Sequence, residues 1–205
     1  PGDTLSGIAQ RELGDAAVLD ASGTVLLDPW AAAVAGPDGT PQMPRTGVAL
    51  DGGSVTLKGR GGYVVAAQGS RIDVSGVADR FDLPTRHPAG LGQAIAYLGT
   101  PVWSDAGNVT LAAAAGLYFD GHLQADGGAT QAEGGTLTLL GLGRLSGQPG
   151  APQASGVLIQ QSGLLLPQGA LADGAIDSAA PAGVLRFAVD RLAGSGIATL
   201  AIGPD

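Results

Sequence analysis

A short pattern of one glycine followed by alternating apolar residues occurs four times in this chain. It reads GGSVTLKG at 52–59, AGNVTLAA at 106–113, GGTLTLLG at 134–141 and AGVLRFAV at 182–189. The apolar residues stand two positions apart, which is the period of a strand with one buried face. The aligned positions are Gly53, Gly107, Gly135 and Gly183, then Val55, Val109, Leu137 and Leu185, then Leu57, Leu111, Leu139 and Phe187. The pattern predicts a strand in each segment.

Two of the copies continue into a longer repeated unit. GGSVTLKG is followed by GGYVVAAQGSRIDVSG (61–76), and AGNVTLAA is followed by AAGLYFDGHLQADGG (114–128). Each continuation holds two further apolar runs, which lie at 63–65, 72–74, 117–119 and 123–125. AAVLDASG (16–23) resembles the end of the first continuation and is interpreted as the third strand of an earlier unit. The unit is therefore three strands joined by turns, in about two dozen residues.

A short strand cannot bury its apolar side alone, so a three-strand unit must stack on a copy of itself. In parallel stacking each strand pairs with its equivalent in the next unit, and the inward Val, Leu and Ile positions form columns. This predicts an all-β chain folded as a parallel β-helix, with glycine at corners that require a positive φ. A β-sandwich or barrel, which also has short strands with frequent turns, is the alternative.

Three segments do not repeat and are expected to be irregular loop insertions, at approximately 29–46, 77–104 and 148–155. They contain most of the prolines, both tryptophans and His87. Residues 90–99 (GLGQAIAYLG) within the second insertion suggest a short helix. Because insertions in repeat proteins often form the binding surface, these loops are the first candidates for contact with a partner.

Composition excludes several classes of function. Ten basic residues against 18 acidic ones give a net charge of −8, so the clustered Lys and Arg that bind nucleic acid or anionic lipid are missing. The chain has no cysteine and therefore no disulfide or thiolate metal site. No apolar run reaches the roughly 18 residues of a membrane helix, so no membrane span is expected.

The segments 52–76 and 106–128 resemble the repeats of filamentous haemagglutinin-type large exoproteins, the secreted partners of bacterial two-partner secretion systems. The resemblance covers most of residues 16–203 and implies a right-handed parallel β-helix. Residues 1–205 would then be a single β-helical segment from the interior of a longer shaft, since no match to the family's N-terminal secretion domain is present. It also implies export through an outer-membrane barrel transporter of a Gram-negative bacterium, and display at the cell surface or secretion as an adhesin. The loops would contact surface glycans or proteins of host or bacterium.

Two other bacterial surface functions remain alternatives. The phrase GDTLSGIA (2–9) matches the first half of a LysM peptidoglycan-binding module, although the second half of that module is missing. An autotransporter passenger would have the same fold and a different exporter.

A carbohydrate-active β-helix enzyme is the third alternative. Such enzymes need clustered carboxylates with a basic residue on one face of the helix. The candidates are Asp73, Asp120 and Asp126, with Arg71 and His122 close in sequence. Aspartates near strand ends more often cap turns by accepting backbone N–H bonds. We therefore expect no enzyme activity and assign no catalytic residue.

No metal or cofactor is expected either. His87 and His122 have no metal-ligand neighbour at strand or helix spacing, and residues 127–135 lack the regular Asp of calcium-binding repeats. The stretch GLGRLSG (141–147) has no Lys and no following helix, so it is not a phosphate loop. Five aromatic residues could stack on sugar rings, although packing against the strands is their more common role: Trp30, Trp103, Tyr63, Tyr97 and Tyr118.

Overall fold

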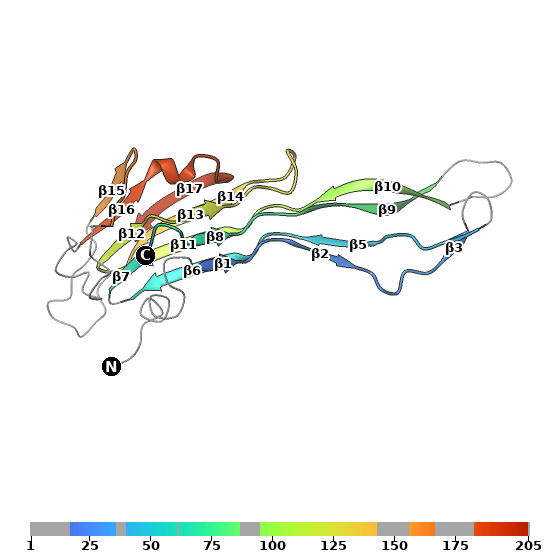
Figure 1. Cartoon of the computed structure of the whole chain (residues 1–205), viewed down its shortest axis with the longest axis horizontal. Helices are drawn as coiled ribbons and strands as arrows, with labels where there is room; N and C mark the ends of the chain where they lie inside the picture. The colour runs from blue at the N-terminus through green and yellow to red at the C-terminus, as the bar shows by residue number, and fades with distance from the viewer. Residues whose placement is uncertain are drawn as a thin grey trace.

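The computed structural model describes residues 17–35, 40–60, 62–86, 95–142, 156–166 and 183–204, and these form an all-β structure (Figure 1). The one short helical element among them is a 3-10 helix, η2 (Val189–Leu192). The strands are β1 (Val18–Asp20), β2 (Thr24–Leu27), β3 (Val34–Ala35), β4 (Pro41–Gln42), β5 (Gly47–Leu50), β6 (Ser54–Gly59), β7 (Tyr63–Ala66), β8 (Arg71–Asp73), β9 (Ala78–Arg86), β10 (Ile95–Trp103), β11 (Asn108–Ala113), β12 (Gly116–Phe119), β13 (His122–Gln124), β14 (Gly135–Gly141), β15 (Gly156–Gln160), β16 (Val184–Ala188) and β17 (Ile197–Pro204).

Three sheets of parallel strands make up one end of the molecule, and together we call them the strand stack. The first sheet has the order β17-β14-β11-β6, the second β15-β16-β12-β7 and the third β1-β8-β13. The repeat β6, β7, β8 contributes one strand to each sheet, and the next repeat β11, β12, β13 lies directly on it. The parallel pairing differs from the antiparallel sheets of a β-sandwich.

The register of these sheets matches the alignment of the sequence repeats. In the first sheet Val109 pairs with Val55 and Leu137, and Leu111 occupies the same position two residues later, between Leu57 and Leu139. In the third sheet Val18–Asp20 pairs with Arg71–Asp73, as the resemblance of 16–23 to 71–76 predicts. The prediction that equivalent strands of successive repeats pair in parallel is therefore confirmed for these segments.

The alignment of the fourth copy of the pattern, at 182–189, with the other three copies is wrong. Leu185 pairs with Leu117 of β12, so β16 belongs to the second sheet and is not equivalent to β14. The strand that lies on β14 is β17, in which Leu200 pairs with Leu137. The error has a physical reason: all three sheets face one core, so their strands share one alternation and a local pattern does not distinguish them.

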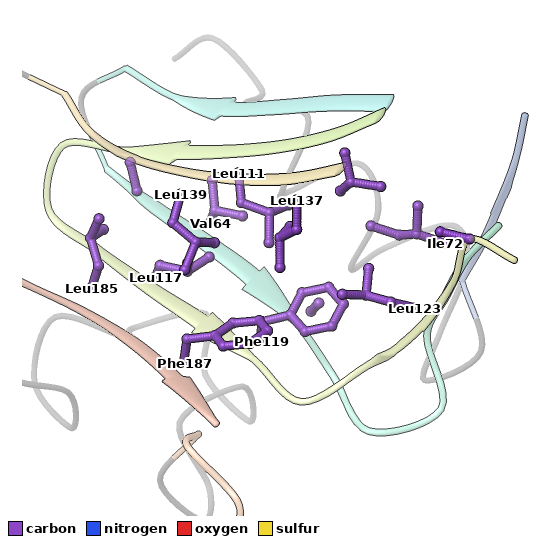
Figure 2. Close-up of a cluster of buried hydrophobic side chains, with 14 of the residues drawn as sticks. Val64, Ile72, Leu111, Leu117, Phe119, Leu123, Leu137, Leu139, Leu185 and Phe187 are labelled. Atoms are coloured by element: carbon purple, nitrogen blue, oxygen red, sulfur yellow. The ribbon is translucent and has the colours of Figure 1, made fainter. Parts of the chain in front are cut away.

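Side chains from the three sheets meet in one hydrophobic core (Figure 2). Leu111 and Leu137 come from the first sheet, Leu117 and Phe119 from the second and Leu123 from the third, and all are buried. The rings of Phe119 and Phe187 are stacked, with centroids 6.1 Å apart and planes at 28°. Burying one such side chain contributes about 1.5–3 kcal/mol to folding, so the columns are the main source of stability.

The aligned glycines serve a different purpose from the expected one. Of the four, only Gly183 has a positive φ, at 88°. At Gly107 an added Cβ would lie 1.8 Å from the carbonyl oxygen of Gly53, because the backbones of two successive repeats touch at this corner. Close backbone approach, not left-handed conformation, therefore requires glycine there.

Two β-hairpins extend away from the strand stack, side by side, and we call residues 24–50 and 78–103 the arm (Figure 1). The first hairpin pairs β2 with β5 and β3 with β4, and the second pairs β9 with β10 along nine residues. Both leave after a third-sheet strand and return to a first-sheet strand, so they project from one corner. At the next crossing of that corner, from β13 to β14, residues 125–134 connect the strands directly.

The arm revises the expected insertions. The segments expected as irregular loops at 29–46 and 77–104 contain paired strands, because alternating apolar residues on either side of a turn favour a hairpin. The prediction of a short helix at 90–99 is wrong for residues 95–99, because they belong to strand β10 (Ile95–Trp103). The remaining part of that segment and the insertion at 148–155 lie outside the described residues.

Candidate functional site

The polar residues considered as catalytic candidates divide between two places. Arg71 and Asp73 lie on β8, and His122 pairs with Arg71 on the neighbouring strand β13. They alternate with the buried Ile72 and Leu123, so they face away from the core. Arg71 is hydrogen-bonded to Asp73 at 2.7 Å and to Gln124 on β13. These side chains form a polar row on the outer face of the third sheet, in which Asp73 is half-buried.

The aspartates of this row cap turns. Asp73 accepts a hydrogen bond from the backbone amide of Ser75 at 3.0 Å, and Asp20, one repeat earlier, accepts the equivalent bond from Ser22. The backbone bond from Ser22 lowers the pKa of Asp20. Burial raises the pKa of Asp73, but the hydrogen bonds from Ser75 and Arg71 lower it by a larger amount. The pKa of Asp73 therefore also lies below the usual value. The turn-capping interpretation is therefore confirmed for Asp73.

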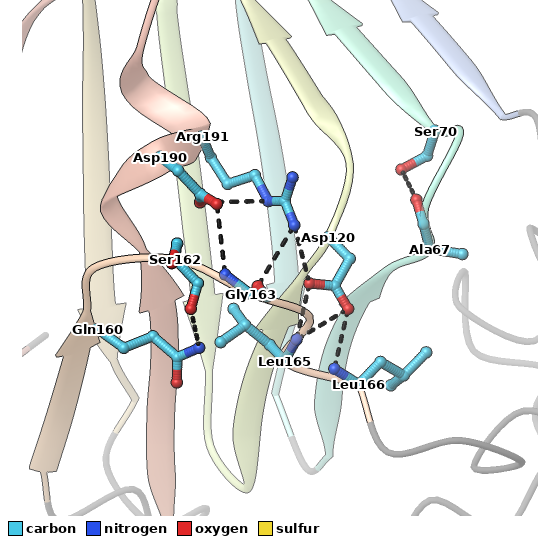
Figure 3. Close-up of polar contacts among 10 residues, drawn as sticks. All are labelled: Ala67, Ser70, Asp120, Gln160, Ser162, Gly163, Leu165, Leu166, Asp190 and Arg191. Atoms are coloured by element: carbon cyan, nitrogen blue, oxygen red, sulfur yellow. Dashed lines mark hydrogen bonds and ion pairs between the residues drawn. The ribbon is translucent and has the colours of Figure 1, made fainter.

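Asp120 is separate from the polar row and has a different environment. It follows β12 and is 2% exposed. Its carboxylate accepts hydrogen bonds from the backbone amides of Leu165 at 2.8 Å and Leu166 at 2.9 Å, and Nη2 of Arg191 lies 3.6 Å from Oδ1 (Figure 3). A buried carboxylate needs such partners, because a charge removed from water is otherwise costly. Asp120 therefore holds a distant segment, residues 161–166, on the second sheet.

The segment 161–166 covers the outer face of the second sheet. Tyr118 points outward between the inward Leu117 and Phe119, yet it is fully buried because Leu165 packs on it. This burial raises the pKa of Tyr118. The side chain of Asp190 accepts a bond from the amide of Gly163 at 3.3 Å and so fixes the same segment from η2. The contacts make this corner a structural anchor.

A second series of carboxylates lies at the corner from which the arm projects. Asp51, Asp105 and Glu133 occupy equivalent positions ahead of β6, β11 and β14. The carboxylate of Asp51 accepts the amide of Asp105 at 3.0 Å, and that of Asp105 accepts the amide of Glu133 at 2.8 Å. Each repeat is thus joined to the next by a side chain as well as by the sheet.

The arm presents apolar side chains to solvent. In the first hairpin Leu26 pairs with Val48, and with the adjacent Leu50 they share one face. Their exposed fractions are 53%, 48% and 39%. The other large apolar residues exposed on the arm are Leu27, Trp30, Met43, Leu83, Leu98 and Trp103. Exposed apolar side chains gathered on one element commonly mark an interaction surface.

Arg45 joins the two hairpins. Its guanidinium makes a bidentate ion pair with Asp79 of β9 and lies 5.7 Å from the ring centroid of Phe81. Its backbone carbonyl accepts the amide of Asp82 at 2.8 Å. The hydrogen bond from Arg45 lowers the pKa of Asp79. The arm is therefore one unit of two connected hairpins.

The structure separates the aromatic residues into two groups. Tyr118 packs against the strand stack, as expected for most of them, whereas Trp30 is 88% exposed and Trp103 is 42% exposed.

Sequence reasoning missed the arm and the anchor at Asp120. Two runs of alternating residues, FDLPTR and IAYLGTPVW, signal the second hairpin. The contact between Asp120 and Leu165 has no local signal, because 45 residues separate them.

The remaining candidates add no site. Asp126 is exposed, and His87 and the LysM-like stretch 2–9 lie outside the described residues. In the part of the chain that the structure describes, no three His, Asp or Glu side chains are grouped to hold a metal ion. Nor does this part contain a helix long and apolar enough to cross a membrane.

Comparison with family models, curated proteins and solved structures found no match to this chain.

Proposed function

We propose that the strand stack is a right-handed parallel β-helix and that the chain is a segment of the structural shaft of a secreted or surface-displayed adhesin of filamentous haemagglutinin type. The observation that carries the proposal is the in-register parallel pairing of successive repeats in three sheets. In an array of this kind each repeat contacts only its neighbours. Each added repeat therefore adds one interface, and the array gains stability with it. Stiffness along the stacking direction follows.

The arm is the adhesive surface in this proposal. It carries the exposed face of Leu26, Val48 and Leu50, and it projects to the side of the strand stack (Figure 1). Trp30 and Trp103 add exposed aromatic surface, which suits both sugar rings and protein side chains. The strand stack positions the arm, and the arm makes the contact.

Removing the arm tests this division. Residues 21–52, 74–106 or both are replaced by copies of 125–134, the direct crossing that the same corner already contains, so that Gly53 and Gly107 keep the position of Gly135. Binding of the chain to a glycan array and to intact host and bacterial cells is measured, with far-UV circular dichroism as the test of folding. We expect the intact chain to bind and the shortened chain to retain its β signal and lose binding.

A surface variant gives the matched control. Leu26, Val48 and Leu50 are changed together to Thr, which retains β propensity and removes apolar area. In the control Val157, Leu158 and Ile159, which are similarly exposed on β15 of the strand stack, are changed to Thr. Loss of binding in the first variant alone supports the arm as the contact surface. Absence of binding by the intact chain, or equal loss in both variants, contradicts the adhesive role.

A further inference from the structure

The second hairpin of the arm, β9 and β10, has two different faces. Alternate residues of a strand share a face, and the register places the apolar Phe81, Leu83, Leu98 and Val102 on one of them. This face is turned toward the first hairpin, because the guanidinium of Arg45 lies over the ring of Phe81. The opposite face therefore points away from the first hairpin.

The opposite face has aromatic and charged side chains. The register places on it Tyr97 and Trp103 of β10 and Arg80 and Asp82 of β9. Trp103 is 42% exposed, Arg80 is exposed, and Tyr97 and Asp82 are half-buried. Tyr97 and Trp103 are six positions apart along β10, about 20 Å at about 3.4 Å per residue. The two charged residues lie opposite the positions between them, so the face is aromatic at both ends and polar in the middle.

Gly99 leaves the middle of this face flat. Because Gly99 has no side chain, the guanidinium of Arg80 lies across it, and Nη2 donates to the carbonyl of Gly99 at 2.7 Å. An added Cβ at Gly99 would lie 3.4 Å from this Nη2 and 3.6 Å from Oδ1 of Asp82. Oδ2 of Asp82 accepts the amide of Arg45 at 2.7 Å, which fixes the carboxylate. A guanidinium and a carboxylate are thus held side by side over one glycine.

The outer edge of β10 is poorly suited to pairing with a peptide strand. The amide of Asp82 donates to the carbonyl of Arg45 at 2.8 Å and so points away from Gly99, which lies opposite Asp82. By the alternation of an antiparallel pair, the backbone groups of Gly99 and Pro101 point outward from the hairpin. Pro101 has no N–H to donate, and the carbonyl of Gly99 already accepts a bond from Arg80. A partner is therefore expected on the face and not on the edge.

This face remains open along the strand stack. The next two crossings at the corner of the arm are residues 125–134, before β14, and residues 193–196, before β17, and neither contains a hairpin. The second lies on the first, since the carbonyl of Ser195 accepts the amide of Ala125 at 2.6 Å. Further coils of a longer shaft would be added beyond β17, which is itself two strands, or about 10 Å, from β11. The exposure of this face therefore does not depend on free ends of the strand stack.

On the basis of the adhesive function proposed above, we propose that this face, which we call the sugar face, binds a neutral oligosaccharide. Tyr97 and Trp103 stack on the apolar sides of sugar rings, and their polar atoms remain in contact with water. Between them the N–H groups of Arg80 donate to sugar hydroxyls and the carboxylate of Asp82 accepts from them. The net charge of −8 repels acidic and sulfated glycans, which selects neutral ones.

A protein partner fits the sugar face less well. Protein interfaces are centred on buried apolar anchors, and the register places the aliphatic Leu83 and Leu98 on the opposite face of the same hairpin. The sugar face is also distinct from the apolar face of Leu26, Val48 and Leu50 on the first hairpin. The arm therefore has two contact surfaces of different chemistry.

Binding of the intact chain to an array of neutral, sialylated and sulfated oligosaccharides tests the ligand class. We expect neutral oligosaccharides to bind. Tyr97→Ala with Trp103→Ala removes both rings and should weaken this binding by about tenfold or more. The matched control is Leu83→Ala with Leu98→Ala on the opposite face, which should leave glycan binding unchanged. Far-UV circular dichroism of both double variants shows whether they fold.

Tryptophan fluorescence gives a second measurement that leaves the sugar face intact. The chain has two tryptophans, so Trp30→Phe leaves Trp103 as the only one. Trp30 is 88% exposed, and its replacement does not disturb the core. The best-bound neutral oligosaccharide from the array is titrated into this variant. We expect the emission of Trp103 to shift with saturation, and this result decides if the double alanine variant does not fold.

The outcomes separate the sugar face from the adhesive function on which it depends. Binding to cells without binding to any glycan leaves the adhesive function standing and overturns the sugar face. Glycan binding that persists without Tyr97 and Trp103, that leaves the emission of Trp103 unchanged, or that is restricted to sialylated or sulfated glycans also overturns it. Failure to bind both glycans and cells overturns both proposals.

Discussion

The strand stack and the arm are built from the same alternation of apolar and polar residues, yet the two regions bury their apolar residues to very different extents. Leu111, Leu117 and Leu137 of the strand stack are fully buried, whereas Leu98 of the arm is 61% exposed and Leu26 is 53% exposed. Alternation therefore determines that a segment forms a strand. Whether the strand contributes to stability depends on what lies against its apolar side.

The two regions also differ in the distance along the chain that their pairing spans. Each strand of the strand stack pairs with a strand from another repeat, so Val55 meets Val109. In the arm the pairing is within one hairpin, as between Leu83 and Leu98. A two-stranded hairpin is marginally stable by itself. The arm is therefore expected to open locally while the strand stack remains folded. Four substitutions test this contrast.

The largest expected effect is that of Leu111→Ala. Leu111 is fully buried between Leu57 and Leu139, so its truncation leaves a cavity in the centre of the core. We expect the free energy of unfolding, measured in urea by circular dichroism, to fall by about 2–5 kcal/mol. Leu98→Ala in the arm should change it by less than about 0.5 kcal/mol. An equal loss at Leu98 would contradict the exposure of its side chain on the arm.

Gly107→Ala is expected to come next. The new Cβ would meet the carbonyl oxygen of Gly53 at 1.8 Å, so two adjacent repeats must separate at the corner. The expected loss is about 1–3 kcal/mol in the same measurement. Gly203→Ala is the control, because no atom lies within 4 Å of the Cβ position there and φ is not positive. A harmless Gly107→Ala would contradict the role of close backbone approach at the corner.

Asp120→Ala removes the anchor of the 161–166 segment. The buried amide of Leu165 loses its acceptor and Arg191 loses its ion pair with Asp120, at a cost of about 1–3 kcal/mol. Amide hydrogen exchange of Leu165 and Leu166 should accelerate, while exchange in β11 stays slow. Asp120→Asn keeps one acceptor oxygen and should show a smaller effect. Unchanged exchange at Leu165 would mean that packing on Tyr118 and the bond from Gly163 to Asp190 hold the segment without Asp120.

The smallest effect concerns the joint of the arm. Arg45→Gln removes the ion pair that lowers the pKa of Asp79, so the pKa of Asp79 should rise toward its ordinary value in an NMR titration, although the backbone amide of Arg80 still lowers it. Because the folded-state pKa lies below the unfolded one, the pair stabilises the joint fully above the unfolded pKa. That stabilisation declines as the pH falls through the folded value. Arg80→Gln, which leaves the Arg45 pair in place, should not change the titration of Asp79.

The sequence allowed the strands of the repeats and their pairing to be predicted, because a period of two identifies a strand and a copied three-strand unit identifies its partners. Val109 and Leu111 are clear cases, since their neighbours in both directions are aligned in the sequence. The alignment of Leu185 with positions of the first sheet was wrong, because in this chain the same alternation of apolar residues occurs on every side of the core. Pairing across an inserted segment is not encoded locally.

The candidate site was predictable to a smaller extent. Turn capping by Asp73 follows from its position two residues before Ser75, a local geometry that the sequence displays. The anchor at Asp120 depends on a segment 45 residues away, which no spacing rule identifies. The arm was interpreted as loops, because proline and glycine in these segments obscured the alternation on either side of its turns. Exposure of Leu26 and Leu98 depends on tertiary packing, which the sequence alone does not reveal.

The strand order of the second sheet has a consequence for how the chain folds. β15 precedes β16 in the sequence but lies outside it, with β16 between β15 and β12. Residues 156–160 therefore have no strand to pair with until residues 184–188 have docked on β12. Assembly in simple order from one end of the chain to the other stops here, and a strand synthesised early must wait for one synthesised later. Docking of β16 on β12 must precede the pairing of β15, so we expect β15 to be the last strand of this sheet to form.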